Sequence, residues 1–226
     1  MQPDNGVTAF SLYAEDYDRW FDTSAGRNLF KSEVNAVQIL MKNIAPPFLE
    51  VGVGTGRFAK ALGISCGVDP SEAMIEIASQ RGITVEKAFG EDLPFSDDIF
   101  GGVFILFTLC FVAKPDVVVS EAVRVLKPGG GLIIGIINRE SPWGRLYLQK
   151  KMQDHPIYKY ANFYSIDEVE KMLGKTGISI EGYSSTLCRP PSDSPIQETA
   201  RNQFVDQAGF LCILARKAND QGYNNH

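Results

Sequence analysis

Short apolar runs alternate along the chain with segments whose hydrophobic residues recur at helical spacing. The apolar runs predict strands over 48–50, 64–68, 83–87, 99–107, 131–137, 178–187 and 209–216. The helical spacing predicts helices over 26–42, 57–62, 71–80, 115–126 and 166–174, after a first helix with an aromatic stripe at Tyr13, Tyr17, Trp20 and Phe21. Strands that alternate with helices in this way indicate an α/β protein with a parallel sheet.

The end of the chain departs from this alternation. The last two predicted strands are joined by residues 189–207, which carry no helical pattern, so these strands can form a hairpin. Residues 217–226 are polar and are expected to form a flexible tail. We therefore expect a single domain over 1–216, with N-terminal helices within 1–44.

Composition and charge narrow the function classes. The 226 residues carry a net charge of −5 without a basic tract, which argues against a nucleic-acid substrate. The longest apolar run, 103–112, is too short to span a bilayer, and the N-terminus has no basic and apolar signal region, so we expect a cytoplasmic protein. The four cysteines are widely separated and show no metal-ligand spacing, which predicts reduced thiols and no metal site.

A glycine loop follows the first predicted strand directly. Gly52, Gly54 and Gly56 remove side chains that would keep the main chain away from a ligand, and they tolerate the positive φ of a tight turn. The loop leads into a helix whose first N–H groups have no intrahelical partners. The pattern predicts a site where backbone contacts a ligand, with simple turn formation as the alternative.

Neighbouring residues distinguish two ligand classes that share such loops. A nicotinamide dinucleotide site needs its third glycine where this chain has Arg57, so that the helix can approach a pyrophosphate. Glu50 would repel a pyrophosphate and would attract an ammonium group, directly or through water. Asp69 ends the next strand and can accept hydrogen bonds from a ribose in either class. Together these residues favour S-adenosylmethionine (SAM).

Four motifs carry a resemblance to a known family. They are Glu50-Val-Gly-x-Gly-x-Gly56, Gly67-Val-Asp69-Pro-Ser71, Glu91-Asp-Leu-Pro-Phe95 and Arg124-Val-Leu-Lys-Pro-Gly-Gly130. Their order resembles the class I SAM-dependent methyltransferases, specifically the methyltransferase-11-like branch that acts on small molecules. The resemblance implies a doubly wound α/β sheet of seven strands in the order 3-2-1-4-5-7-6, mostly parallel with an antiparallel last strand.

The resemblance also implies how SAM is held at the first two strands. Gly52, Gly54 and Gly56 would line its methionine part, and Glu50 would hold its amino group. Asp69 would bind the ribose hydroxyls.

Further along the chain, the resemblance implies an adenine site. Glu91 would face the exocyclic amine, with the Gly90 backbone near the ring edge. Pro70 and Leu93 would lie against the faces of the ring. The methionine tail and the transferable methyl would lie beside Phe107 and Thr108.

The segment 138–164 is the candidate substrate cap, because it leaves the carboxyl end of a central strand, where open α/β sheets bind ligands. Five basic and two acidic residues make it locally positive, and it is rich in aromatic residues. Arg139, Trp143 and Arg145 are its candidate substrate contacts, together with Tyr17 from the N-terminal stripe. The alternative is an amphipathic helix from Trp143 to Met152 that packs its aromatic side chains on the sheet.

We expect a SAM-dependent methyltransferase that acts on a small molecule and releases S-adenosylhomocysteine (SAH). Such an enzyme mainly aligns a nucleophile behind the methyl group and excludes water, so no residue is assigned as a catalytic base. Two other functions are compatible with parts of the pattern. They are a non-catalytic SAM-binding module and a nicotinamide-dependent oxidoreductase.

Overall fold

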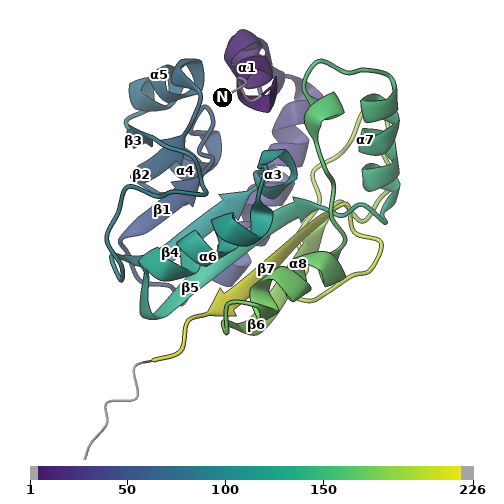
Figure 1. The fold of residues 1–226 in the computed structure, drawn as a ribbon. Helices are drawn as coiled ribbons and strands as arrows, with labels where there is room; N and C mark the ends of the chain where they lie inside the picture. The colour runs from purple at the N-terminus through teal and green to yellow at the C-terminus, as the bar shows by residue number, and fades with distance from the viewer. Residues whose placement is uncertain (1–4, 220–226) are drawn as a thin grey trace, which may run out of the picture.

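The computed structural model describes residues 5–219, which form a seven-stranded sheet with helices on both faces (Figure 1). The strands are β1 (Phe48–Val51), β2 (Cys66–Asp69), β3 (Thr84–Lys87), β4 (Phe100–Leu106), β5 (Leu126–Ile137), β6 (Ser179–Thr186) and β7 (Phe210–Arg216). The helices are α1 (Asn5–Leu12), α2 (Ala14–Trp20), α3 (Ser24–Met41), α4 (Arg57–Leu62), α5 (Glu72–Gln80), α6 (Pro115–Val125), α7 (Pro142–Met152) and α8 (Ile166–Gly174). Two short 3₁₀ helices are η1 (Leu109–Phe111) and η2 (Tyr158–Tyr160).

The sheet has the predicted topology. Its strand order is β3-β2-β1-β4-β5-β7-β6. The pairs from β3 through β5 are parallel, whereas β7 runs antiparallel to both β5 and β6. The predicted hairpin of the last two strands is therefore confirmed, and so is the doubly wound α/β class.

Several boundaries and one helix differ from the sequence prediction. Strand β5 begins at Leu126, earlier than expected, because Leu126 already pairs with Phe100 of β4. The sequence pattern did not predict helix α1, which precedes the aromatic stripe. Lys217, predicted to begin a flexible tail, donates from Nζ to the Asp98 carboxylate at 2.8 Å. Residues 220–226 of that predicted tail lie outside the described residues.

The core consists of two apolar layers, one on each face of the sheet. Helices α6 and α8 cover the face that is in front in Figure 1, where Val118 and Val169 are fully buried. Helices α3 and α4 cover the opposite face with Val37 and Ala59. Strands that are buried on both faces need apolar side chains on both, which explains the continuous apolar run of β4.

The chain order reverses between β1 and β4, which lie side by side in the middle of the sheet. From β1 the chain continues to β2 and β3 on one side, and β4 starts the other half. Open α/β sheets leave a crevice at the carboxyl ends of the strands at this switch point. The glycine loop, Asp69 and the residues after Leu106 all lie at this edge.

Candidate functional site

The glycine loop adopts the left-handed turn that its composition predicts. Gly52, Gly54 and Gly56 have φ values of 73°, 53° and 78°. A Cβ on Gly52 would collide with the Thr108 side chain, whereas the space in front of the Gly54 Cα is open. Gly52 and Gly54 line a cavity, and Gly56 instead lets Ala78 pack closely behind the loop.

Asp69 ties the end of β2 to the glycine loop. Its Oδ2 accepts a hydrogen bond from the Gly54 N–H, and its Oδ1 accepts one from the Ser71 N–H, both at 2.9 Å. Burial raises the pKa of Asp69 to about 6, although the two backbone hydrogen bonds oppose that rise. The carboxylate lines the cavity, where its remaining lone pairs can accept further hydrogen bonds.

Glu50 lies behind the loop and does not line the cavity. Its side chain is only 2% exposed, and its Oε2 has no hydrogen-bond partner among residues 5–219. Burial raises the pKa of Glu50 well above its ordinary value, and the nearby Asp69 carboxylate raises it further. A buried acceptor without a donor is costly, so this oxygen fits a cationic or water donor supplied from outside the chain.

The predicted adenine residues lie on the β2–β3 side of the cavity. Pro70, Gly90 and Glu91 line it, whereas Leu93 is buried in the core and does not. Glu91 Oε1 accepts hydrogen bonds from the backbone N–H groups of residues 113 and 114, at the start of α6. That oxygen of Glu91 therefore anchors the segment that leads into α6.

Phe107 and Thr108 turn the chain away from the end of β4. Phe107 has a φ of 58°, which is rare for a residue other than glycine, and its ring stacks on Phe210 at 4.7 Å. The hydroxyl of Thr108 lies 3.1 Å from the Val51 carbonyl oxygen and donates toward it. Both residues line the cavity, so the two central strands contribute to it at the same level.

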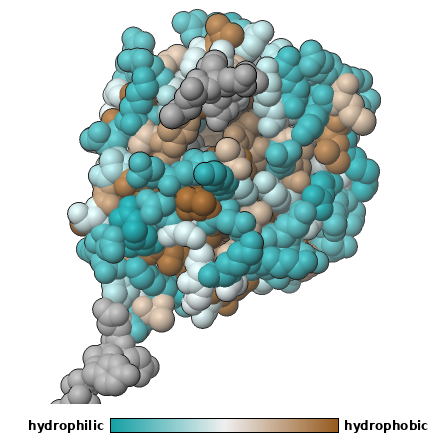
Figure 2. All heavy atoms as spheres, viewed as in Figure 1, coloured by the Kyte–Doolittle hydropathy of each residue, from teal (hydrophilic) through white to brown (hydrophobic). Residues whose placement is uncertain are grey.

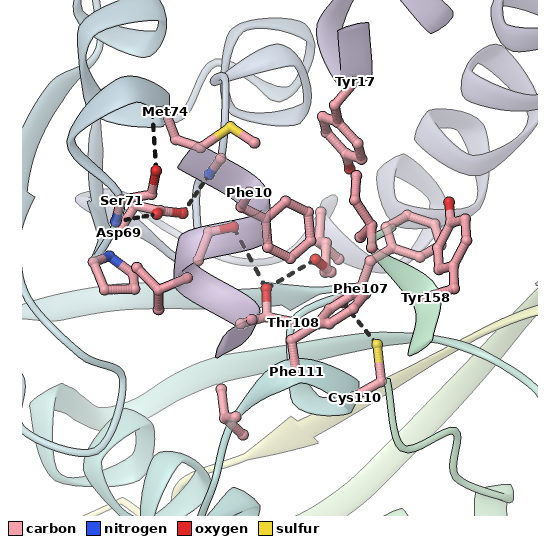
Figure 3. A pocket seen from close by; sticks show the side chains of 18 of the residues that line it. Phe10, Tyr17, Asp69, Ser71, Met74, Phe107, Thr108, Cys110, Phe111 and Tyr158 are labelled. Carbon is pink, nitrogen blue, oxygen red and sulfur yellow. Dashed lines mark hydrogen bonds between the residues drawn. The ribbon is translucent and has the colours of Figure 1, made fainter. Parts of the chain in front are cut away.

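These residues surround one cavity of about 420 Å³. Figure 3 shows its two parts, with Asp69, Ser71 and Met74 on one side and the rings of Tyr17, Phe107 and Tyr158 on the other. Phe10 and Thr108 lie between the two parts. We call the first part the polar half and the second the aromatic half, which also includes Glu33, Cys110, Phe111, Tyr147, Lys150 and His155.

Of the predicted substrate contacts, Tyr17 lines the aromatic half and three others do not. Trp143 is buried and donates from its indole N–H to the Arg189 carbonyl oxygen at 2.8 Å. Arg139 pairs with Glu168, and the exposed Arg145 bonds to the carbonyl oxygen of residue 140. The substrate role of these three residues stays a prediction that the geometry does not favour.

The aromatic half contains residues that the sequence analysis did not select. Tyr147 and Lys150 come from α7, His155 from the following loop and Tyr158 from η2. The segment after Trp143 thus forms a helix, as the alternative interpretation held, and its second part also lines the cavity. Glu33 could have been noticed as an acid on the otherwise apolar face of α3.

Comparison with known proteins identifies the family. A family model described as "Methyltransferase domain" matches residues 49–134. An uncharacterised protein of Methanocaldococcus jannaschii is 41% identical over 93% of this chain and 100% of its own length. A Thermotoga maritima crystal structure, described as a SAM-dependent methyltransferase and possible histamine N-methyltransferase, superposes with a TM-score of 0.85 and 38% identity, covering 93% of this chain and 99% of that one. The chain belongs to the SAM-dependent methyltransferases.

A more distant relative acts on a named substrate. The demethylmenaquinone methyltransferase of Tropheryma whipplei is 31% identical over 57% of this chain and 64% of its own length.

Because the chain belongs to the SAM-dependent methyltransferases, SAM is its cofactor. The orphaned Glu50 oxygen, the open space at Gly54 and the buried Asp69 carboxylate are compatible with the ammonium, methionine and ribose groups of SAM.

Arg57, which occupies the position of a dinucleotide-site glycine, forms ion pairs with Asp18 and Asp22 in this methyltransferase. Its guanidinium donates to both carboxylate oxygens of Asp18 at 2.8 and 2.9 Å and to those of Asp22 at 2.9 and 2.7 Å. Arg81 joins the group through Asp18 at 2.6 Å. These ion pairs fix α2 against the helix that follows the glycine loop.

The rest of the described chain shows few other candidate sites. The face in Figure 2 is mainly hydrophilic, with hydrophobic residues in small separate groups. Across residues 5–219, no cluster of three or more His, Cys, Asp and Glu side chains could hold a metal ion. None of the helices within this range is long and apolar enough to cross a membrane.

Proposed function

We propose that this methyltransferase transfers the methyl group of SAM to a small-molecule acceptor bound in the aromatic half of the cavity. The observation that carries the proposal is the continuity of the two halves, because Gly54 and Asp69, which fit SAM, line the same cavity of about 420 Å³ as an aromatic chamber. This volume lies in the range of sites for small molecules. A macromolecular acceptor would need a more open surface.

On this proposal the polar half binds SAM. Asp69 accepts hydrogen bonds from the ribose hydroxyls, and Gly54 lets the methionine part approach the main chain. Glu50 holds the ammonium group through water, because its carboxylate lies behind the loop. Pro70 and Gly90 contact the adenine.

The chemistry requires little of the protein beyond alignment. The sulfonium of SAM supplies an activated methyl group when it is bound. The aromatic half then positions the acceptor atom in line with that group and excludes water. Tyr147 to Tyr158 close this half, so the second part of the predicted 138–164 cap limits the size of the acceptor.

Relatives support a small acceptor. The names of the Tropheryma and Thermotoga proteins refer to a demethylmenaquinone and to histamine, which are both small molecules. The acidic composition of this chain also disfavours a nucleic acid, and we place the enzyme in the cytoplasm.

Calorimetry with SAM, SAH, NAD and NADP tests the cofactor assignment. We expect saturable binding of SAM and SAH and no heat with the two dinucleotides, because Arg57 and its acidic partners occupy the approach that a pyrophosphate needs. Transfer of a labelled methyl group to members of a small-molecule library then tests catalysis. SAM binding without any transfer would favour the alternative of a non-catalytic SAM-binding module.

A further inference from the structure

Glu33 is a buried acid that faces the aromatic half of the cavity. It lies on the inward face of α3, between the buried residues Leu29 and Val37, and it is 8% exposed. An acid on this face is unusual, because the neighbouring positions pack apolar side chains against the sheet. Since the side chain lines the cavity, its carboxyl group can reach a bound ligand.

No cation within residues 5–219 forms an ion pair with the Glu33 carboxylate. Burial raises the pKa of Glu33 to about 8 and is the only cause of that rise. Asp18 shows the contrast, because burial there is outweighed by hydrogen bonds from Arg57, Thr55 and Arg81 that hold its pKa at about 2. A buried carboxylate without such partners fits a cation that comes from outside.

Three phenol rings line the same cavity as this acid. The negative charge of Glu33 contributes to the raised pKa values of Tyr17, Tyr147 and Tyr158, after the larger effect of burial, which shows that all three lie within its electrostatic reach. Aromatic faces attract cations. Two of these rings already do so, because Lys150 Nζ lies 4.8 Å from the Tyr147 centroid and 5.5 Å from that of Tyr158.

We propose that Glu33, Tyr17, Tyr147 and Tyr158 form the binding site for an amine group of the acceptor, and that this amine nitrogen receives the methyl group. The inference rests on the proposed function, since it names the substrate class of the same cavity. Glu33 supplies the negative charge that recognises the protonated amine, and the rings supply the cation-binding walls. A neutral alcohol could donate a hydrogen bond but would leave the negative charge of the buried acid uncompensated, and a carboxylate would repel it.

The proton and electron balance assigns a second role to Glu33. A protonated amine has no lone pair, so it first gives one proton to the Glu33 carboxylate. The nitrogen lone pair then forms the bond to the methyl carbon, the carbon–sulfur bond breaks, and its electron pair stays on sulfur in SAH. The methylated amine leaves with the positive charge that the sulfonium brought, and Glu33 later releases its proton to solvent.

The test compares ligands that differ mainly in their polar end. Benzylamine, propylamine, benzyl alcohol and phenylacetate are titrated at millimolar concentrations into the SAH-saturated protein by calorimetry. We expect an amine to bind and the alcohol and the carboxylate to bind at least about tenfold more weakly, the difference that a charge-assisted hydrogen bond supports. Failure of both amines to bind, or preference for the alcohol or the carboxylate, would overturn the proposal.

Variants separate the role of Glu33 from general damage. Glu33→Gln keeps the shape and removes the charge, so amine affinity should fall about 10- to 100-fold while SAH affinity stays unchanged. Glu76→Gln, on the exposed surface of α5, is the matched control and should bind both ligands like the wild type. If Glu33→Gln binds the amine as tightly as the wild type does, the amine site is rejected and the proposed function stays intact. If the wild-type protein does not bind SAH at all, the proposed function itself is rejected.

Turnover tests the proton transfer. With a bound amine as substrate, Glu33→Gln should lower kcat at saturating amine as well as raise KM, because the amide cannot accept the proton. Glu33→Asp should restore part of both. An unchanged kcat would reject Glu33 as the proton acceptor.

Discussion

At the scale of single residues, Gly54 offers a direct test of the cofactor site. Its φ of 53° is strained for any other residue, and the space next to it is the cavity itself. Gly54→Val should therefore lose SAH binding, because the new branches enter ligand space. Gly82→Val is the matched control, since Gly82 has a φ of 85° and open space but lies away from the cavity. Gly82→Val should show the same loss of stability from backbone strain but should keep the wild-type affinity for SAH. Calorimetry on the folded proteins measures that affinity.

Asp69 predicts a pH dependence of SAM binding. Its pKa is raised to about 6, so the carboxylate becomes protonated as the pH falls through that value and loses acceptor strength. The contribution of Asp69 to SAM affinity should be full above about pH 7 and should fall by up to about tenfold per pH unit below 6.

Two variants check this dependence. Asp69→Asn should weaken SAM binding about 10- to 100-fold at neutral pH and flatten the profile, leaving only the contribution of Glu50. Asp92→Asn, in the exposed turn after Glu91, should bind as the wild type does. A wild-type pH profile in Asp69→Asn would contradict the ribose role.

At the scale of elements, α2 is held to the glycine-loop helix by ion pairs. The depressed pKa of Asp18, about 2, means that its carboxylate stabilises the fold at pH values above its unfolded pKa. Asp18→Asn should lower the free energy of unfolding by about 1–3 kcal/mol at neutral pH, since it leaves Arg81 without a charged partner and Arg57 with Asp22 alone.

Unfolding at low pH and a control variant on the surface test this expectation further. The stabilisation by Asp18 should disappear as the pH falls from about 4 toward 2, so wild type and Asp18→Asn should converge there in urea unfolding. Asp16→Asn removes an exposed pair with Arg19 and should cost less than about 1 kcal/mol. Equal costs for the two variants at neutral pH would mean that the cluster does not hold α2.

Two variants in helix α7 test whether its residues stabilise the fold or contact the substrate. Trp143→Ala should lower the free energy of unfolding by about 3–5 kcal/mol, because the indole is buried and packs on Gly209. Arg145→Ala should change it by less than about 0.5 kcal/mol, since the side chain is exposed. Urea unfolding measures both, and a methyl-transfer defect in a stable Arg145→Ala protein would support the substrate role predicted from the sequence.

At the scale of the whole molecule, the cavity couples distant parts of the chain. Helix α1, near the start of the chain, contributes Phe10 to the cavity. Helix α7 and η2, in the second half of the chain, contribute Tyr147 and Tyr158. Hydrogen exchange should therefore slow in both segments when SAH and a bound amine are present. Helix α8 does not line the cavity and serves as the internal control. Protection confined to the glycine loop would show that the aromatic half takes no part in binding.

The sequence by itself determined the sheet and the polar half of the cavity. Gly52 and Gly54 follow β1, and Asp69 ends β2, each within a short motif, so their position at one edge follows from the order of the strands. The positive φ values that the glycines adopt are a local property that glycine alone tolerates without strain. Arg57 likewise argues from the sequence alone against a dinucleotide site.

Only the tertiary structure decided the aromatic half. Glu33 and Tyr147 line the same cavity although more than one hundred residues separate them, because α3 and α7 both pack near the end of the central strands. The composition of 138–164 indicated a binding segment, but the rotation of α7 turns Trp143 into the core and Arg145 to solvent, and brings Tyr147 and Lys150 to the cavity. Helical spacing groups residues on one face of a helix, and the packing of the whole chain decides which surroundings that face meets.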